Sequence, residues 1–225
     1  MREIVLDTET TGLEPGEGHR VVEIGALELV HRVPTGKTWH SYINPERDMP
    51  LDAYRVHELS EDFLADKPRF AEIAEGLLEF IGDAPLVIHN APFDAGFLNA
   101  EFQRLGLPPL AGARLVDTLE IARRRFLGAP NNLNALCDRF GVDKSERTVH
   151  GALIDCSLLA EVYLHLTGGR QPGLAFQAAP QAGADKGRRQ GGGRFRPPRA
   201  HAPTPEELAA HKAFVAGLKD PIWEE

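Results

Sequence analysis

Three extended apolar segments lie within the first 44 residues, and this crowding constrains the fold more than any other feature of the sequence. Residues 2–8 and 21–30 carry apolar runs typical of strands, and residues 38–44 form a third such segment. The connections between them are short. The three segments therefore predict strands of one antiparallel meander, which needs only tight turns between neighbours.

Beyond residue 50 the pattern changes to alternating helices and short strands. Residues 85–89 (PLVIH) predict a buried strand, and residues 115–117 are a fifth strand candidate. Strands first, followed by alternating strands and helices, predict an α/β fold with a mixed sheet of about five strands flanked by helices. Helices are expected at 52–65 (one or two short ones), 70–81, from about Pro92 to Leu105, 118–126, 133–140 and 151–166.

The composition changes after Thr167-Gly168-Gly169. Residues 177–203 are rich in Gly, Pro, Ala, Gln and Arg, with almost no core-forming residues, and predict a disordered linker. Thr204 and Glu207 then have the spacing of a capping box, and the helix that they begin is expected to run to about Leu218. The chain is thus divided into a domain at 1–169, a peptide at 170–176, the linker, and a C-terminal helix with its tail at 204–225.

Charge is distributed unevenly along the 225 residues. The formal net charge is −8, but residues 177–201 hold six Lys or Arg against one Asp, a balance of +5, which leaves −13 for the rest. The negative charge outside residues 177–201 predicts weak binding of nucleic acid, through metal ions and a narrow groove. A partner protein would then supply additional affinity. Cys137 and Cys156 form no CxxC pair, which fits a reducing compartment. No signal peptide and no apolar stretch near the ~20 residues of a membrane span is present, so a soluble, cytoplasmic protein without membrane contact is expected.

Asp7 and Glu9 stand at the end of the first strand. Residues i and i+2 of a strand point to the same face, so the two carboxylates lie side by side. Neighbouring acids repel, and a hard divalent cation such as Mg²⁺ or Mn²⁺ would compensate them. The alternative is a solvated strand end.

Two further acids also allow either a structural or a metal-binding interpretation. Asp94 falls in the first turn of the helix after the 85–89 strand, where an acid can also serve the helix dipole. Asp155 lies one turn into an apolar helix, either on its solvent stripe or directed at a metal ion. His150 precedes that helix and could equally be an ordinary surface residue.

Taken in order, these motifs resemble the DEDDh exonuclease family. Asp7-x-Glu9, His89-Asn90-x-x-Phe93-Asp94 and His150-x-x-x-x-Asp155 match its DxE, HNxxFD and HxxxxD motifs. His150 disfavours the variant of the family that has Tyr at this position. The resemblance implies a ribonuclease H-like fold and 3′–5′ exonuclease activity.

Longer phrases, among them VLDTETTGL, LVIHNAPFDAGFL and RTVHGALIDCSLLAEVYLHLTGG, resemble the family of proofreading epsilon subunits of bacterial DNA polymerase III over residues 1–169. This resemblance implies replisome partners for the tail. Gln171, Leu174 and Phe176 are similar to the peptide that binds the beta sliding clamp, and Trp223 with the terminal helix is similar to the segment that binds the polymerase alpha subunit. Pro172 and the Pro-Ile-Trp ending depart from the family pattern.

The family also implies a two-metal hydrolysis of the terminal phosphodiester, with two Mg²⁺ or Mn²⁺ ions. Asp7, Glu9, Asp94 and Asp155 are expected to hold the ions, and His150 is expected to take a proton from the attacking water. Thr10, Leu13, His57 and Phe93 are expected to contact the last nucleotide of a single-stranded or frayed 3′ end. For Leu13 and Phe93, core packing is an equal alternative.

Two rival hypotheses use the same residues. An RNA-trimming DEDDh exonuclease would need the same acids and histidine, although it would not need the linker and terminal helix. A mainly structural replisome subunit would keep the domain while catalysis was vestigial, although it would not need five converging polar groups.

Overall fold

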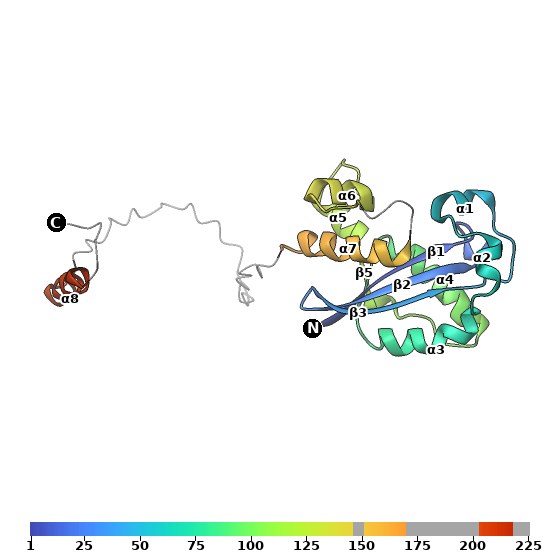
Figure 1. The fold of residues 1–225 in the computed structure, drawn as a ribbon, viewed down its shortest axis with the longest axis horizontal. Helices are drawn as coiled ribbons and strands as arrows, with labels where there is room; N and C mark the ends of the chain where they lie inside the picture. The colour runs from blue at the N-terminus through green and yellow to red at the C-terminus, as the bar shows by residue number, and fades with distance from the viewer. Residues whose placement is uncertain (146–150, 170–202, 218–225) are drawn as a thin grey trace, which may run out of the picture. The chain divides into compact units, whose positions relative to one another are not determined.

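The computed structural model describes residues 1–145, 151–169 and 203–217. Five strands in these ranges form one mixed sheet in the order β3-β2-β1-β4-β5. The strands β1 (Arg2–Thr10), β2 (Val21–Val30) and β3 (Val33–Tyr42) form the predicted antiparallel meander, and β4 (Leu86–Ile88) and β5 (Leu115–Asp117) extend it in parallel from β1. The mixed α/β sheet predicted from the sequence is confirmed (Figure 1).

The third strand was misplaced by its sequence pattern. It was expected at 38–44, but β3 begins at Val33, directly after a turn in which His31 and Arg32 adopt positive φ. Residues 33–38 are exposed, because β3 is an edge strand, so they lack the apolar alternation that marks a half-buried strand. Pro34 and Gly36 obscure the strand further, since both are uncommon inside sheets.

Successive side chains of β1 point to opposite faces of the sheet and contribute to two separate hydrophobic cores. Ile4 and Leu6 pack on one face of the sheet against α3 (Phe70–Ile81) and α4 (Ala91–Arg104). Val5 packs on the other face against α6 (Leu133–Phe140) and α7 (Ala152–Leu166), with α5 (Thr118–Arg125) at its margin. Figure 1 shows α7 and α3 on opposite sides of the sheet. The apolar face predicted for 70–81 is confirmed, since Phe70, Ala74, Leu77 and Ile81 are buried.

Short elements complete the domain. The segment 52–65 forms two short helices, α1 (Leu51–His57) and α2 (Glu61–Ala65), as expected. Single 3₁₀ turns lie at Pro15–Glu17 and Gly112–Arg114. The parallel strands β1, β4 and β5 all run toward the same edge of the sheet, and polar residues follow each of them. In open sheets of this kind, ligand sites collect beyond the carboxyl ends of the strands.

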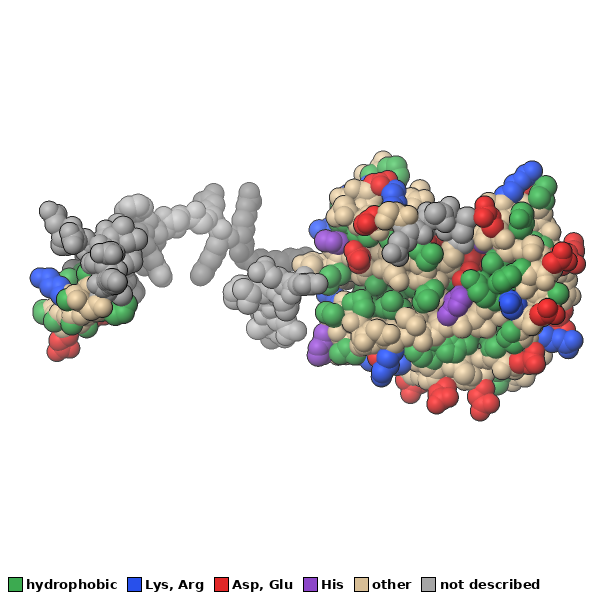
Figure 2. Space-filling view, viewed as in Figure 1, with side chains coloured by type: hydrophobic (Ala, Val, Ile, Leu, Met, Phe, Trp, Pro, Cys, Tyr) green, Lys and Arg blue, Asp and Glu red, His purple; other side chains and the backbone are tan. Residues whose placement is uncertain are grey.

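The chain divides into two compact units, Met1–Ala175 and Phe176–Glu225. The second contains α8 (Pro205–Ala216), which begins with the expected capping box: Glu207 N donates to Thr204 Oγ1, and Thr204 N donates to Glu207 Oε2. No residue of α8 is buried, and Leu208 and Phe214 are 47% and 65% exposed. Figure 2 shows hydrophobic side chains, in green, at the surface of this helix. None of the helices in the described ranges combines the length and apolar character of a membrane span.

Candidate metal centre

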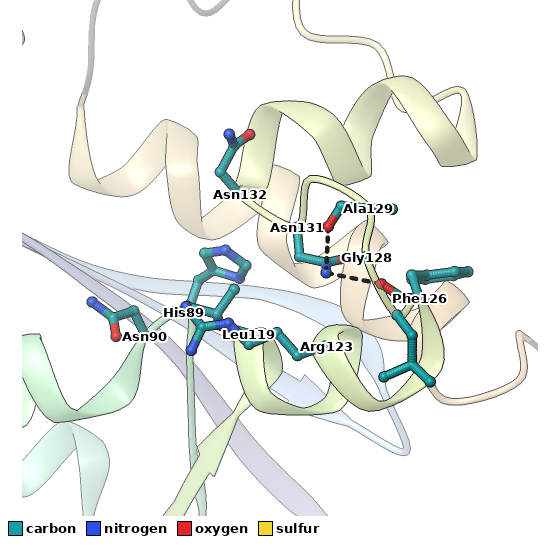
Figure 3. A pocket seen from close by; sticks show the side chains of 10 residues that line it. His89, Asn90, Leu119, Arg123, Phe126, Gly128, Ala129, Asn131 and Asn132 are labelled. Atoms are coloured by element: carbon teal, nitrogen blue, oxygen red, sulfur yellow. Dashed lines mark hydrogen bonds between the residues drawn. The ribbon is translucent and has the colours of Figure 1, made fainter.

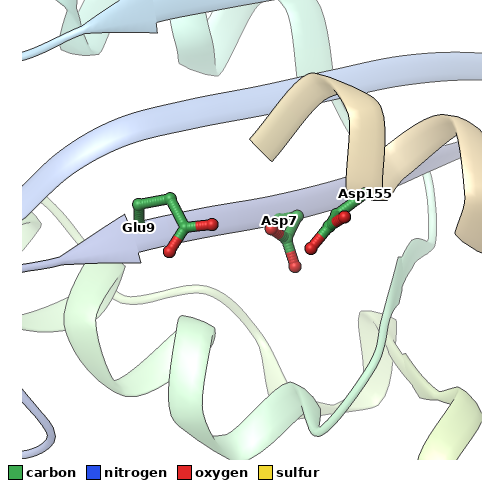
Figure 4. Close-up of side chains that lie close together, drawn as sticks. All are labelled: Asp7, Glu9 and Asp155. Atoms are coloured by element: carbon green, nitrogen blue, oxygen red, sulfur yellow. The ribbon is translucent and has the colours of Figure 1, made fainter. Parts of the chain in front are cut away.

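Three carboxylates converge at the end of β1. Asp7 and Glu9 come from β1 and Asp155 from the first turn of α7, and one oxygen from each lies within 4.8 Å of the other two (Figure 4). Asp7 is half-buried, whereas Glu9 and Asp155 are buried. Carboxylate oxygens at this spacing, in a partly dehydrated position, are suitable ligands for a hard divalent cation. The three carboxylates are therefore a suitable donor set for the divalent ions that the motifs predict. Because Asp155 is buried, it does not lie on the solvent-exposed stripe of its helix.

A glycine allows α7 to approach the sheet closely enough for this convergence. Gly25 pairs with Asp7 across β1 and β2, and a Cβ atom on Gly25 would lie 2.5 Å from the carbonyl carbon of Ala152 and 2.6 Å from its oxygen. Such contacts are far below van der Waals separation. Any larger residue at position 25 would displace the first turn of α7, which carries Asp155.

A buried thiol fixes the same contact. Cys156 Sγ lies 3.2 Å from the carbonyl oxygen of Gly25 and 3.7 Å from that of Val5, close enough to donate a weak hydrogen bond. Burial raises the pKa of Cys156 well above its ordinary value, and the negative charges of Asp7 and Asp94 raise it further. The thiol therefore keeps its proton and acts as a donor that holds α7 to the sheet, next to the acids.

Asp94 reaches the site from the opposite face of β1. Its Oδ1 accepts hydrogen bonds from the backbone N and the hydroxyl of Thr8, at 2.9 and 2.8 Å. Asp94 is 3% exposed, and this burial raises its pKa to about 7, although the bonds from Thr8 oppose the shift. It lines the same 380 Å³ pocket as the three converging acids but is not one of them. Asp94 is therefore held by specific bonds to β1, so interaction with the dipole of α4 alone does not account for its position.

Polar contacts also order the chain after β4. His89 Nδ1 lies 2.9 Å from Thr118 Oγ1, and the backbone N of Asn90 donates to Asp117 Oδ1 at 3.1 Å. Asn90 adopts a left-handed conformation, with φ 71°, and caps α4. Burial lowers the pKa of His89, while the charge of Asp117 opposes this effect. These contacts tie β4 to β5 and set the direction of α4, and hence the position of Asp94.

The predicted substrate contacts lie at different depths. Phe93 lines the pocket and also packs against Phe97, with ring centroids 5.0 Å apart, so it belongs to the core while its substrate contact stays a prediction. Leu13 is 77% exposed, which excludes core packing. Thr10 is buried and donates to the carbonyl oxygen of Gly12, and His57 is buried and accepts from Leu59 N. Thr10, Leu13 and His57 are not among the residues that line the acidic pocket.

Several predicted residues lie outside the described ranges: His150, Gln171, Leu174, Phe176 and Trp223. Conversely, the motifs did not point to the residues that position the acids, Gly25, Cys156 and Thr8, or to Asn132 and Asn134, which line the pocket. Only Asn132 has a local signal, since an Asn before an apolar helical segment is a typical N-cap, and its Oδ1 accepts from Ala135 N.

Comparison with known proteins assigns the family. Residues 4–163 match the family model described as Exonuclease. The chain belongs to this exonuclease family. A protein named DNA polymerase III subunit epsilon from Rickettsia felis is 51% identical over 224 residues, which is 97% of each chain. The protein of the same name from Escherichia coli strain K12 is 48% identical over 182 residues, covering 78% of this chain and 74% of that protein.

Solved structures with low sequence identity support the fold. Exonuclease X in complex with 5′ overhanging duplex DNA aligns with 73% of this chain and 90% of its own, at 24% identity and a TM-score of 0.59. The nuclease domain of 3′hExo, a DEDDh family member, aligns over the same shares at 18% identity and a TM-score of 0.62. The expected ribonuclease H-like exonuclease fold is confirmed, as is the enzyme class, a 3′–5′ exonuclease of the epsilon type.

Proposed function

We propose that the chain hydrolyses the 3′-terminal phosphodiester of DNA at the pocket formed by Asp7, Glu9 and Asp155, and that it does so as the proofreading subunit of a DNA polymerase III. The convergence of three carboxylate oxygens within 4.8 Å carries this proposal. Relatives of 48–51% identity named DNA polymerase III subunit epsilon support the assignment to a replicative polymerase. Such a subunit would work where the chromosome is copied, in the cytoplasm at the nucleoid.

Asp7, Glu9 and Asp155 would hold two divalent cations, with Asp7 placed to serve both, and Asp94 would support the second. Mg²⁺ or Mn²⁺ is the expected occupant, because the donors are all carboxylate oxygens. When bound, such ions would make water a nucleophile at neutral pH and stabilise the departing 3′ oxygen. The bonds from Thr8 hold Asp94 Oδ1 toward β1 and so orient its carboxylate in the pocket.

His150 would accept the proton of the attacking water. An unperturbed imidazole has a pKa of about 6.5, which suits a general base at neutral pH. His150 lies outside the described residues, so its assignment depends on the match to the HxxxxD motif with Asp155. Phe93 would contact the terminal nucleotide where it lines the pocket, and the exposed Leu13 would separate the last base from its neighbour, with Thr10 and His57 behind them.

The tail would attach the nuclease to the replisome. In α8, Leu208 and Phe214 are exposed, which suits a segment that buries them against a partner. We assign α8 and Trp223 to the polymerase alpha subunit, and Gln171, Leu174 and Phe176 to the beta sliding clamp. A chain with a net charge of −8 gains from this tethering, because attachment raises the local concentration of the DNA end.

The decisive experiment follows the purified chain on matched single-stranded DNA and RNA oligonucleotides in Mg²⁺ and in Mn²⁺. Faster release of terminal nucleotides from DNA supports the proposal, and faster release from RNA would favour an RNA-trimming enzyme. Addition of the polymerase and clamp should raise the rate on a primer with a mismatched 3′ end. A chain that binds both partners yet releases no nucleotide with either metal would be a structural subunit.

A further inference from the structure

A second cleft adjoins the metal pocket. It has a volume of about 680 Å³ and lies between the end of β4, helix α5 and the loop that precedes α6 (Figure 3). His89 and Asn132 line both this cleft and the pocket of the acids. We call this cleft the Arg123 cleft.

The lining of the Arg123 cleft contrasts with the rest of the chain. None of its ten residues is acidic, although the chain carries a net charge of −8. The lining offers one guanidinium, three side-chain amides and an imidazole, besides Leu127, which is 86% exposed. A cleft that is rich in donors and free of carboxylates suits an anion, and an exposed apolar side chain beside it suits a base.

Arg123 differs from its two neighbours on α5. Arg124 forms an ion pair with Glu120, and Arg125 Nη1 donates to the carbonyl oxygens of His165 and Leu166, at 2.8 and 3.0 Å. Within the described ranges, the side chain of Arg123 makes no hydrogen bond or ion pair, and Figure 3 shows it extending along α5 toward His89. Its guanidinium is therefore available for a ligand in the cleft.

The opposite wall of the cleft is held in place. Asn131 Nδ2 donates to the carbonyl oxygens of Phe126 and Ala129, at 3.2 and 2.9 Å. Arg139 donates to the carbonyl oxygen of Pro130 at 2.9 Å and covers the ring of Phe126, 4.3 Å from its centroid. A loop bonded at these points is preorganised, so a ligand would not need to order it.

We propose that the Arg123 cleft binds single-stranded DNA on the 5′ side of the cleaved residue, with Arg123 on a backbone phosphate and Leu127 against a base. This inference rests on the proposed function, because a strand whose last phosphodiester lies at Asp7 and Asp155 must leave the pocket through an open side. The cleft is such an opening, and it supplies the cation that the acidic pocket lacks among its lining residues. Arginine suits this role, since its planar fork matches phosphate oxygens.

The test compares Arg123→Ala with the matched control Arg124→Ala on two substrates. One substrate is a short single-stranded oligodeoxynucleotide, and the other is the p-nitrophenyl ester of thymidine 5′-phosphate, which has a scissile ester but no 5′ strand. For Arg123→Ala, we expect KM for the oligonucleotide to rise about tenfold, as for a lost charge-assisted hydrogen bond. The slope of log kcat/KM against log salt should become shallower by about 0.7, the value for one lost phosphate contact on a single strand.

The same variant should hydrolyse the nitrophenyl ester at the wild-type rate, and Arg124→Ala should match wild type on both substrates. Unchanged oligonucleotide kinetics for Arg123→Ala, or an equal loss for both variants, would overturn the inference and leave the proposed function intact. An equal loss of Arg123→Ala on the nitrophenyl ester would also overturn it, because the arginine would then act on the metal pocket itself. If wild type hydrolysed neither substrate with Mg²⁺ or Mn²⁺, the proposed function would fail as well.

Discussion

Buried acids occur in two settings in this domain. In the body of the domain, away from the end of β1, each buried glutamate of the described residues lies against its own hydrogen-bonding partner. At the end of β1, by contrast, the oxygens of Asp7, Glu9 and Asp155 converge on one another within 4.8 Å. The pairs in the body are Glu3 with Tyr163, Glu23 with His40, Glu28 with Arg2, and Glu101 with Arg20, at 2.6–2.8 Å.

One acid from each region shows how the surroundings act on the pKa. The hydrogen bonds from Arg2 and Thr35 lower the pKa of Glu28, whereas burial raises the pKa of Asp94, beside the converging acids, to about 7. Glu28 is thus stabilised in the charged form by fixed protein donors. Asp94 remains costly to ionise, and a cation bound nearby would reduce that cost.

The largest expected effect is on the converging acids. Asp7→Asn should reduce exonuclease activity by about a thousandfold or more, because the loss of metal-ion catalysis costs several kcal/mol of transition-state stabilisation. Since Asp7 is half-buried and faces other acids, the fold should survive, and thermal unfolding without metal should occur at or above the wild-type temperature. Wild-type activity in the folded variant would contradict the site assignment.

Gly25→Ala should reduce activity about a hundredfold, since a displacement of about 1 Å at a catalytic group costs this much. Its Cβ would collide with Ala152, so α7 and Asp155 must move. Overpacking should also lower the free energy of unfolding by about 1–3 kcal/mol. Gly96→Ala on α4 is the control, because nothing lies within 4 Å of its added Cβ, and its activity should equal that of wild type. An active Gly25→Ala enzyme would show that the close approach is not required.

Glu101→Gln tests the other kind of acid. Arg20 donates to both oxygens of Glu101, at 2.6 and 2.9 Å, and Glu101 is 3% exposed. Removing the negative charge should lower the free energy of unfolding by about 2–3 kcal/mol, because Arg20 keeps a largely buried charge. Chemical denaturation measures this loss, and activity per folded molecule should stay within about twofold of wild type, since no metal ligand changes. A large loss of activity without a loss of stability would contradict the claim that Glu101 serves the fold and not the metal site.

The smallest expected effect is the change in metal-free stability caused by Asp94→Asn, and it depends on pH. A carboxyl with a raised pKa in the folded state favours folding at low pH, and this contribution is lost as pH rises from about 4 to about 7. The neutral amide avoids the loss. In chelator, the stability gained by Asp94→Asn should therefore be about 2 kcal/mol larger at pH 8 than at pH 5. A gain that did not change with pH would mean that the pKa of Asp94 is not raised.

Much of the fold followed from the sequence, for reasons that particular residues make clear. The apolar face of α3 and the capping box of α8 have strong local periodicity and spacing, and both were placed correctly. The edge strand β3 was misplaced because residues 33–38 face solvent and carry no apolar alternation. Apolar alternation in a sequence indicates which residues are buried, and an exposed edge strand buries too few residues to show it.

The site was predictable only in part. Motif spacing predicted that Asp7, Glu9, Asp94 and Asp155 belong to one site, and the four acids line one pocket. The positioning residues could not be found in this way. The role of Gly25 arises from contact with Ala152, 127 residues away, and that of Thr8 from contact with Asp94. Contacts between distant segments leave no local signature, because any glycine or threonine in a strand looks the same in sequence.

Titration of metal-free protein with Mn²⁺ by calorimetry tests the central claim, that Asp7, Glu9 and Asp155 form a metal site. Wild type and Glu101→Gln should bind Mn²⁺ with the same affinity and stoichiometry, since the Arg20–Glu101 pair lies outside the pocket. Asp7→Asn, with its fold verified by thermal unfolding, should lose the tight binding. Unaltered affinity and stoichiometry in Asp7→Asn would show that the converging acids do not hold the metal.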